Sequence, residues 1–375
     1  MSADRMSADR VLVLNCGSSS VKYRLLDGAD TVADGTVERI GEPGGDAADH
    51  GAALRDVMER VDLRGLGTVG HRVVHGGTEF SAATLIDDAV VAAIERLVPL
   101  APLHNPANLT GIAVARELLP NVPQVAVFDT AFHATIAPAG ACYAVDPELA
   151  ERFGVRRYGF HGTSHAYVAR RTAALLGRGV DGTRVITLHL GNGASACAVA
   201  SGRSVATSMG MSPVAGLVMG TRSGDIDPTV VFHLHRVAGM PVDEIERLLT
   251  RGSGLRGLTG DNDMRAVLRR RDAGDPAAGL AFDVYCRRIT EYVGAYLAVL
   301  GGADAVTFTG GVGQNAPQVR AAALAGLHGL GIAVDPARNA RGAPVISPDG
   351  SPVAVCVVPT DEELEIATQA RAVPA

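Results

Sequence analysis

Three short glycine-rich runs each follow a strand-like segment, and turns of this composition can bind phosphate. They are NCGSSS at residues 15–20, GNGAS at residues 191–195 and GGVGQN at residues 310–315. Glycine lets the backbone approach an anion closely, so that peptide N–H groups can donate to its oxygens. The third run leads into a helix-like segment, whose positive N-terminal end would add to the attraction. Taken alone, the first run is more simply explained as a β-hairpin turn.

Arginine must supply nearly all the cationic chemistry, because Lys22 is the only lysine in the chain. A Walker A phosphate loop is therefore excluded, since no G-x-x-x-x-G-K exists. Arg72 in GHRVVHGG and Arg222 in GLVMGTRSGDIDP each stand among glycines and small or β-branched residues. The planar guanidinium suits bidentate recognition of carboxylate or phosphate. Both are candidates for binding an anionic substrate, and ordinary surface charge is the alternative for each.

A histidine stands at the predicted start of a helix, in HGTSHAYVARRTAALLG. His161 precedes this helix, for which Thr163 or Ser164 would be the N-cap. Beside the positive end of a helix, His161 could share in holding an anion. It could also be a core histidine, a surface residue or half of a metal-binding pair with His165. H-x-x-x-H without the glutamate of H-E-x-x-H is weak support for zinc.

Two carboxylates are further candidates. Asp129 ends the buried strand-like segment QVAVFD, where it needs a metal, an arginine or a hydrogen-bond partner. The segment PTDEELEIATQA predicts a C-terminal helix with Thr360 as N-cap and Glu363 completing a capping box. Glu362 is then left without a structural role and is available for chemistry.

The third glycine run also permits a different function. Gly311, Gly313 and Ala316 satisfy G-x-G-x-x-A, and Asp335 ends the next strand-like segment about twenty residues on, as in dinucleotide-binding proteins. Its position argues against this hypothesis, since such a unit more often opens its domain. A dehydrogenase would bind nicotinamide.

Strand-like and helix-like segments alternate along the chain, which predicts α/β layers. One predicted helix starts in HNPANLTG, with Asn105 as N-cap and Pro106 at its first position. At 375 residues the chain favours two domains. Residues 11–28 also align with residues 185–202, each a strand, a small-residue turn and a returning strand. Two hairpins could match by chance, but such a repeat is typical of two related domains that face each other across a cleft.

Composition narrows the class of protein. A net charge of -6 argues against a nucleic-acid-binding surface. The five cysteines are scattered and never form C-x-x-C, which fits a reducing cytoplasm and no disulfide framework. No segment sustains the apolar run that a membrane span needs. The first ten residues repeat MSADR and are expected to be a disordered or appended start.

The chain resembles the acetate kinase family over nearly all its length after residue 10. The motifs that carry the resemblance are LNCGSSSVKY, GHRVVHGG, APLHNPAN, VFDTAFH, RRYGFHGTSH, HLGNGAS, GLVMGTRSGDIDP, FTGGVGQN and PTDEELEIA. The resemblance implies the two-domain α/β fold of actin, sugar kinases and heat-shock ATPases, with a duplicated ribonuclease H-like core. It also implies reversible, ATP-dependent phosphorylation of acetate to acetyl phosphate, and a cytoplasmic homodimer. The predicted lobes are 11–150, completed by a helix at 361–375, and 151–360, which would hold the nucleotide site and the dimer interface.

Site residues follow from the same motifs. Asn15 and Glu362 would be associated with Mg²⁺, or Mn²⁺ in its place, and Asp129 would lie near the metal and the attacking carboxylate. Arg72 and Arg222 would clamp the substrate carboxylate and the transferring phosphoryl group, while His161 would stabilise the transition state. The catalytic set is thus Asp129, His161, Arg222 and Arg72.

The resemblance also assigns two binding regions. The substrate's methyl group would contact Val74, Leu103, Phe160 and Pro213, with Arg72 on its carboxylate. The nucleotide would contact Lys22, His189, Gly191, Asn192, Gly193, Asp263, Met264, Arg265, Gly311, Val312, Gly313, Gln314 and Asn315. The family usually has Glu at Gln314, which affects a contact on the nucleoside side. A propionate or butyrate kinase, or a non-catalytic actin-like scaffold that binds nucleotide, is the alternative function.

Overall fold

The computed structural model describes residues 10–17 and 19–374, which form two compact units. The first unit runs to Ala134 and resumes at Asp361, and the second comprises Thr135–Thr360. The border predicted from the sequence lay after residue 150. Segment 135–150 joins the second unit through backbone contacts, such as the bond from Arg157 N to Ala141 O. The predicted disordered start lies outside the described residues except for Arg10, which begins the first strand and pairs with Asp27 at 3.1 Å.

The first unit is built on one mixed sheet, in the order β3-β2-β1-β4-β6-β5. β1 to β3 form an antiparallel meander, β4 and β6 continue parallel to β1, and β5 adds an antiparallel edge. The strands are β1 (Arg10–Cys16), β2 (Val21–Asp27), β3 (Asp30–Val37), β4 (Leu66–Val73), β5 (Thr84–Leu85) and β6 (Gln124–Phe128).

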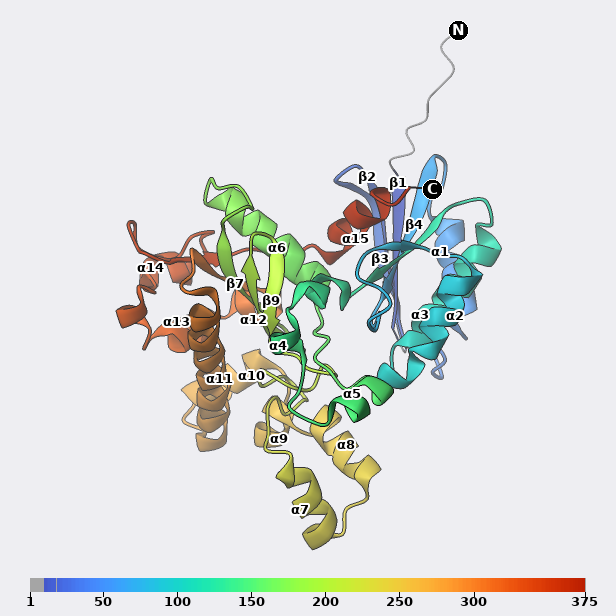
Figure 1. Cartoon of the computed structure of the whole chain (residues 1–375). Coiled ribbons are helices and arrows are strands. Elements are labelled where there is room, and N and C mark those ends of the chain that lie inside the picture. Colours follow the sequence, from blue (N-terminus) through green and yellow to red (C-terminus); the bar gives the residue numbers. More distant parts are fainter. Residues whose placement is uncertain (1–9, 18, 375) are drawn as a thin grey trace. The chain divides into compact units, whose positions relative to one another are not determined.

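The alternation of side chains along β1 explains why helices cover both faces of this sheet. Leu12 and Leu14 point into a core with α1 and α3, whereas Val11 and Val13 point to the opposite face and pack on α15. In Figure 1 α15 lies on one side of the strands, and α1 and α3 on the other. The helical segments are α1 (His50–Arg60), α2 (Asp88–Arg96), the 3-10 turns η1 (Val98–Leu100) and η2 (Ala131–Thr135), α3 (Asn105–Leu118) and α15 (Glu362–Arg371).

The second unit has its own mixed sheet, in the order β11-β10-β7-β8-β9. β7 to β9 are an antiparallel meander, and β10 and β11 continue parallel to β7. Its strands are β7 (Arg184–Leu190), β8 (Ala194–Ala200), β9 (Arg203–Thr207), β10 (Ala305–Thr309) and β11 (Ala354–Val357). The meander followed by parallel strands repeats the first unit, with β7 in the place of β1. The predicted duplication is therefore confirmed at the level of sheet topology.

Helices pack against the sheet of the second unit. α6 packs on one face of the sheet through Val168, which shares a core with Val185 and Ala305. The helical segments are α4 (Pro138–Ala141), α5 (Pro147–Phe153), α6 (Gly162–Leu175), α7 (Thr229–Ala238), α8 (Val242–Arg251), α9 (Gly254–Thr259), α10 (Met264–Asp272), α11 (Pro276–Leu300), α12 (Gly310–Asn315), α13 (Pro317–Leu324), η3 (His328–Leu330) and α14 (Pro336–Ala340). None of the helices described is both long and apolar enough to cross a bilayer.

A buried histidine is expected to make the first unit sensitive to acid. His71 in β4 is buried, and its Nε2 lies 2.7 Å from Gln124 Oε1. Burial lowers the pKa of His71 to about 4, although the bond to Gln124 opposes this shift. The unfolded chain thus binds more protons than the folded one between the unfolded pKa and about 4.

Stability of the first unit should therefore fall as the pH falls through this window. We expect a loss of about 3 kcal/mol from His71 between about pH 7 and about pH 4, measured by denaturant unfolding. His71→Gln removes the titrating group and should flatten this part of the profile. The exposed His328→Gln is the control and should leave the profile unchanged. Equal acid losses in the wild type and His71→Gln would rule this origin out.

Candidate functional site

A buried ion pair lies at the carboxyl ends of two strands of the first unit. Arg72, near the end of β4, donates from Nε to Asp129 Oδ1 at 3.0 Å and from Nη2 to Asp129 Oδ2 at 2.5 Å. Asp129 directly follows β6, and only 1% of its side chain is exposed. This bidentate pair supplies the partner that the sequence required for Asp129.

Asn15 joins the same cluster from the neighbouring strand. Its Oδ1 accepts a hydrogen bond from Arg72 Nη1 at 3.2 Å. β1, β4 and β6 are adjacent and parallel, so their last residues meet at one edge of the sheet. Parallel strands present functional side chains at this edge. The turn after Asn15 is the predicted hairpin between β1 and β2, and its Ser18 lies outside the described residues.

Charges around Arg72 keep it firmly protonated. Burial lowers its pKa, but the carboxylates of Asp129, Glu362 and Glu363 outweigh this effect and raise the pKa of Arg72 overall. Burial raises the pKa of Asp129 and Arg72 pulls it down, while the charge of Glu362 raises it further. Glu362 thus lies close enough to act on both members of the pair. The protonated Arg72 is therefore surrounded by the side-chain oxygens of Asn15, Asp129 and the nearby glutamates.

α15 starts one residue later than the sequence predicts. Its N-cap is Asp361, whose side chain accepts from Leu364 N, so the expected cap at Thr360 is wrong. Glu363 is no capping-box partner. It pairs instead with Lys22 Nζ at 3.1 Å and with Arg24 Nη2 at 3.5 Å. The early position of Glu362 in α15 is as predicted.

Two buried asparagines of α3 hold the strand ends in place. Asn108 donates to Cys16 O at 2.7 Å and accepts from Val74 N at 3.1 Å, thereby bridging β1 and the residue after β4. Asn105 makes the matching pair with His75, so it is not the N-cap, which is His104. Sequence reasoning missed this role. The only signal was the spacing of two asparagines, three apart, in APLHNPAN.

The residues predicted to contact the methyl group belong to both units. In the first unit Val74 is buried beside Asn108, whereas Leu103 is 51% exposed in the loop before α3. In the second unit Phe160 is buried just before His161, and Pro213 accepts a hydrogen bond from Arg222.

A cluster of histidines lies in the second unit at the start of α6. His161 precedes the helix with φ 57°, in the left-handed region that side chains seldom adopt, and caps it without a side-chain bond. Its ring stacks on His189 at 4.2 Å between centroids, and its Nδ1 lies 2.9 Å from Ser195 Oγ. Strained backbone of this kind gathers at functional sites.

The cap predicted at Thr163 or Ser164 is therefore wrong. The Ser164 hydroxyl lies 2.7 Å from His189 Nδ1 and 2.8 Å from Thr360 Oγ1, so it bonds within the histidine cluster and does not cap the helix. His165 bonds Thr187 and Ser195 through its two ring nitrogens and is a buried core residue. The described residues contain no group of three or more His, Cys, Asp or Glu side chains arranged to hold a metal. His165 thus stands in a hydroxyl network.

Arg222 reaches the same place from a loop. A side-chain carbon on Gly193 would lie 3.5 Å from both Arg222 Nη1 and His161 Cε1, so both groups lie beside the turn between β7 and β8. Arg222 Nη1 donates to Pro213 O at 3.1 Å, and burial lowers the pKa of the guanidinium. Across residues 10–17 and 19–374, no carboxylate pairs with Arg222. A part-buried cation beside a glycine turn is suited to an anion.

A pocket of about 540 Å³ opens beside this turn, and its whole wall belongs to the second unit. Predicted nucleotide-binding residues supply most of that wall: Gly191, Asn192, Asp263, Met264, Arg265, Gly311, Val312 and Asn315. Leu255, Asn262, Leu268 and Ala316 complete it, and sequence reasoning did not single them out as nucleotide contacts. Four predicted contacts are not wall residues: His189 in β7, Gly193 in the turn after it, and Gly313 and Gln314 in α12. Lys22 lies in the first unit, paired with Glu363.

The dinucleotide hypothesis does not fit this pocket. Gly311 and Gly313 lie inside α12, a helix of only six residues, and not in a turn before a long helix. Asp335 caps α14, where its Oδ1 accepts from Arg338 N at 2.8 Å. A carboxylate engaged in capping is a poor ligand for a ribose hydroxyl.

Comparison with known proteins decides the family. The model of the acetokinase family matches residues 10–368. The acetate kinase of Streptomyces coelicolor is 59% identical, over 98% of this chain and 97% of its own. That of Leifsonia xyli subsp. xyli is 56% identical, over 96% and 98% of the two chains. The chain belongs to the acetokinase family.

Solved structures agree with membership of the acetokinase family. A crystal structure of Porphyromonas gingivalis acetate kinase has a TM-score of 0.92 and 42% identity, and the match covers 96% of this chain and 98% of that one. A propionate kinase from Francisella tularensis has a TM-score of 0.92 and 38% identity, covering 97% and 100%. The predicted family and fold class are confirmed.

Within this acetokinase fold, the predicted site residues form two groups. Asn15, Arg72, Asp129 and Glu362 gather in the first unit. His161 and Arg222 lie beside the Gly193 turn of the second unit, near the pocket described above. Their roles in binding and catalysis belong to the proposal that follows.

Proposed function

We propose that this protein phosphorylates acetate with ATP, reversibly, to give acetyl phosphate and ADP. One observation carries most weight: Arg222, without a carboxylate partner in the described chain, meets His161 at the Gly193 turn, beside a pocket walled by the predicted nucleotide-binding residues. Such a turn with a cation suits the phosphate tail of a nucleotide, and the pocket suits its base and ribose.

The proposed reaction is a direct in-line transfer. An acetate oxygen attacks the γ-phosphorus of ATP, forming one P–O bond while the bond to the β-phosphate oxygen breaks and ADP leaves. Acetate is already ionised at neutral pH, so no general base is needed. Charge spreads over the equatorial oxygens in a loose transition state, and catalysis therefore depends on positioning and cationic groups. We assign these tasks to Arg72, Arg222 and His161, with Asp129 orienting Arg72 through their two hydrogen bonds.

Mg²⁺ is the proposed metal. The first unit offers hard oxygen ligands in Asn15 Oδ1 and the carboxylates of Glu362 and Asp129, which is the donor chemistry that Mg²⁺ prefers. Mg²⁺ commonly binds one or two protein oxygens plus substrate phosphates, so a larger protein cage is unnecessary. Asn15 and Glu362 would hold it, and when bound it would neutralise charge on the β- and γ-phosphates. Mn²⁺ has similar ligand preferences.

A longer carboxylic acid is the alternative substrate. A propionate kinase shares this fold at a TM-score of 0.92. One methylene in an apolar pocket changes discrimination by only about 1 to 3 kcal/mol. We retain acetate because the curated relatives compared above are named acetate kinases.

An assay across three acids tests the proposal. Purified protein with ATP and Mg²⁺ is given acetate, propionate or butyrate, and the acyl phosphate is trapped with hydroxylamine. We expect the highest kcat/KM with acetate. Preference for propionate or butyrate would favour the alternative substrate, and no acyl phosphate with any acid would favour a nucleotide-binding scaffold.

We also propose that the protein is a cytoplasmic homodimer. α7 has no buried residue, and Phe232 and Val237 in it are 60% and 73% exposed. Figure 1 shows α7 and α8 projecting from the rest of the second unit. A second copy would cover these apolar side chains. Light scattering should give twice the chain mass of 38.6 kDa, and a monomer would contradict the proposal.

A further inference from the structure

A fully buried arginine lies behind the pocket of the second unit. Arg320 in α13 is 1% exposed, and its hydrogen bonds go to neutral oxygens. Nε and Nη2 donate to Oδ1 and O of Asn339, each at 2.7 Å. Nη1 donates to the carbonyls of Gly313 at 2.8 Å and Gln314 at 2.7 Å.

Burying an arginine in this way carries a large desolvation free energy. Within the described part of the chain no carboxylate pairs with Arg320, and burial lowers its pKa. An apolar side chain of similar volume would often pack at lower cost than a buried charge. The free-energy cost of burying Arg320 must therefore be offset by its four hydrogen bonds and by the segments that these bonds connect.

Those bonds hold the corner between α12 and α13. The last carbonyls of a helix have no partner within it, and here Arg320 satisfies two of them at the end of α12. α12 carries Gly311, Val312 and Asn315, which are wall residues of the 540 Å³ pocket. The shape of that wall thus depends on a side chain that does not reach it.

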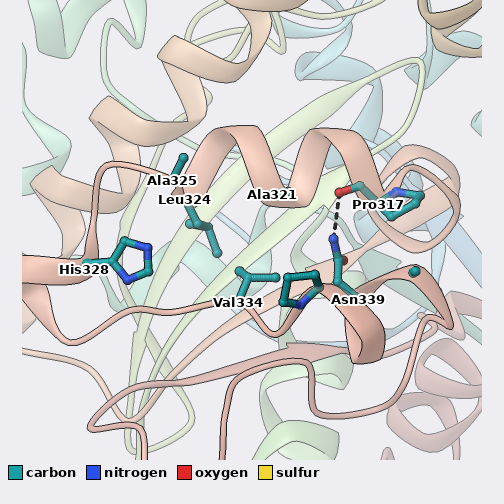
Figure 2. Close-up of a pocket in the computed structure, with 9 residues that line it drawn as sticks. Pro317, Ala321, Leu324, Ala325, His328, Val334 and Asn339 are labelled. Atoms are coloured by element: carbon teal, nitrogen blue, oxygen red, sulfur yellow. Dashed lines mark hydrogen bonds between the residues drawn. The ribbon is translucent and has the colours of Figure 1, made fainter.

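Asn339 in α14 connects Arg320 to the start of α13. Its Nδ2 donates to Pro317 O at 2.9 Å, as Figure 2 shows, while its Oδ1 accepts from Arg320. Pro317 begins α13 directly after Ala316, itself a wall residue of the pocket. Asn339 also borders a separate hollow of about 280 Å³, drawn in Figure 2, so trimming its side chain enlarges an existing space.

We propose that Arg320 and Asn339 are positioning residues for the nucleotide: together they fix the α12–α13 corner in the form that binds the nucleoside part of ATP and ADP. The proposal rests on the proposed function, which puts the nucleotide in this pocket. Neither residue contacts the pocket itself, so their effect is on binding geometry and not on the acid substrate.

The test compares Asn339→Ala and Arg320→Met with the wild type. We expect the dissociation constant for ADP, measured by calorimetry, and KM for ATP to rise about tenfold or more, because small misplacements of positioned groups have large effects. KM for acetate and kcat at saturating ATP should stay within about twofold. Thermal unfolding reports the fold, and if Arg320→Met does not fold, Asn339→Ala decides.

Ser347→Ala is the matched control. Ser347 is buried in the same unit, and its Oγ accepts from Val355 N, away from α12. It should lose stability while keeping the ADP affinity of the wild type. The proposal is overturned if folded Asn339→Ala binds ADP as tightly as the wild type, or if both KM values rise together. Acetate phosphorylation by the wild type is scored separately, so a protein that binds ADP but makes no acetyl phosphate removes the proposed reaction alone.

Discussion

Arg222→Ala is expected to lower kcat for acetyl phosphate formation on the order of 10²-fold or more, the loss seen when a donor to developing charge is removed. The guanidinium lies beside the Gly193 turn with His161 and has no carboxylate partner in the described residues, as its proposed contact with the phosphoryl group requires. KM for ATP should change far less than kcat, because Arg222 is not a wall residue of the pocket.

Steady-state kinetics with the hydroxamate assay measures this effect. The control is Arg287→Ala in α11, which removes an exposed arginine paired with Glu291 and should leave kcat unchanged. Full activity in a folded Arg222→Ala would remove Arg222 from the mechanism.

Arg72→Met is expected to damage both stability and catalysis. It leaves the carboxylate of Asp129 buried without its cation, and breaking a buried pair in this way costs about 3–5 kcal/mol. It also removes a proposed ligand of the substrate carboxylate. Denaturant unfolding and the hydroxamate assay report the two losses separately.

A double variant separates the structural role of this pair from its catalytic one. Arg72→Met with Asp129→Leu replaces both charges by apolar groups, a change that is often neutral for stability. We expect the double variant to regain most of the stability lost by Arg72→Met but none of its activity. Recovery of acetate phosphorylation would show that the pair is structural only, and the catalytic role would pass to other residues.

Motifs in the sequence were enough to predict the family, while the roles of the site residues stay predictions. The aligned hairpins at residues 11–28 and 185–202 became β1–β2 and β7–β8, because strand and turn preferences are local properties of the chain. The candidate arginine at Arg222 and the strand-end carboxylate at Asp129 were likewise readable from neighbouring residues. Helix starts were less reliable, as Asp361 and not Thr360 caps α15.

Contacts between distant residues were not readable in this way. Asn108 bridges Cys16 and Val74, and Arg320 donates both to carbonyls of α12 and to Asn339, yet nothing adjacent in the sequence marks these partners. The sequence by itself determined which chemistry is present, since composition and short motifs depend on residues next to one another. Only the tertiary structure decided which carboxylate pairs with Arg72 and which buried side chains hold the pocket in shape, because hydrogen bonds act over a few ångströms in space, whatever the separation along the chain.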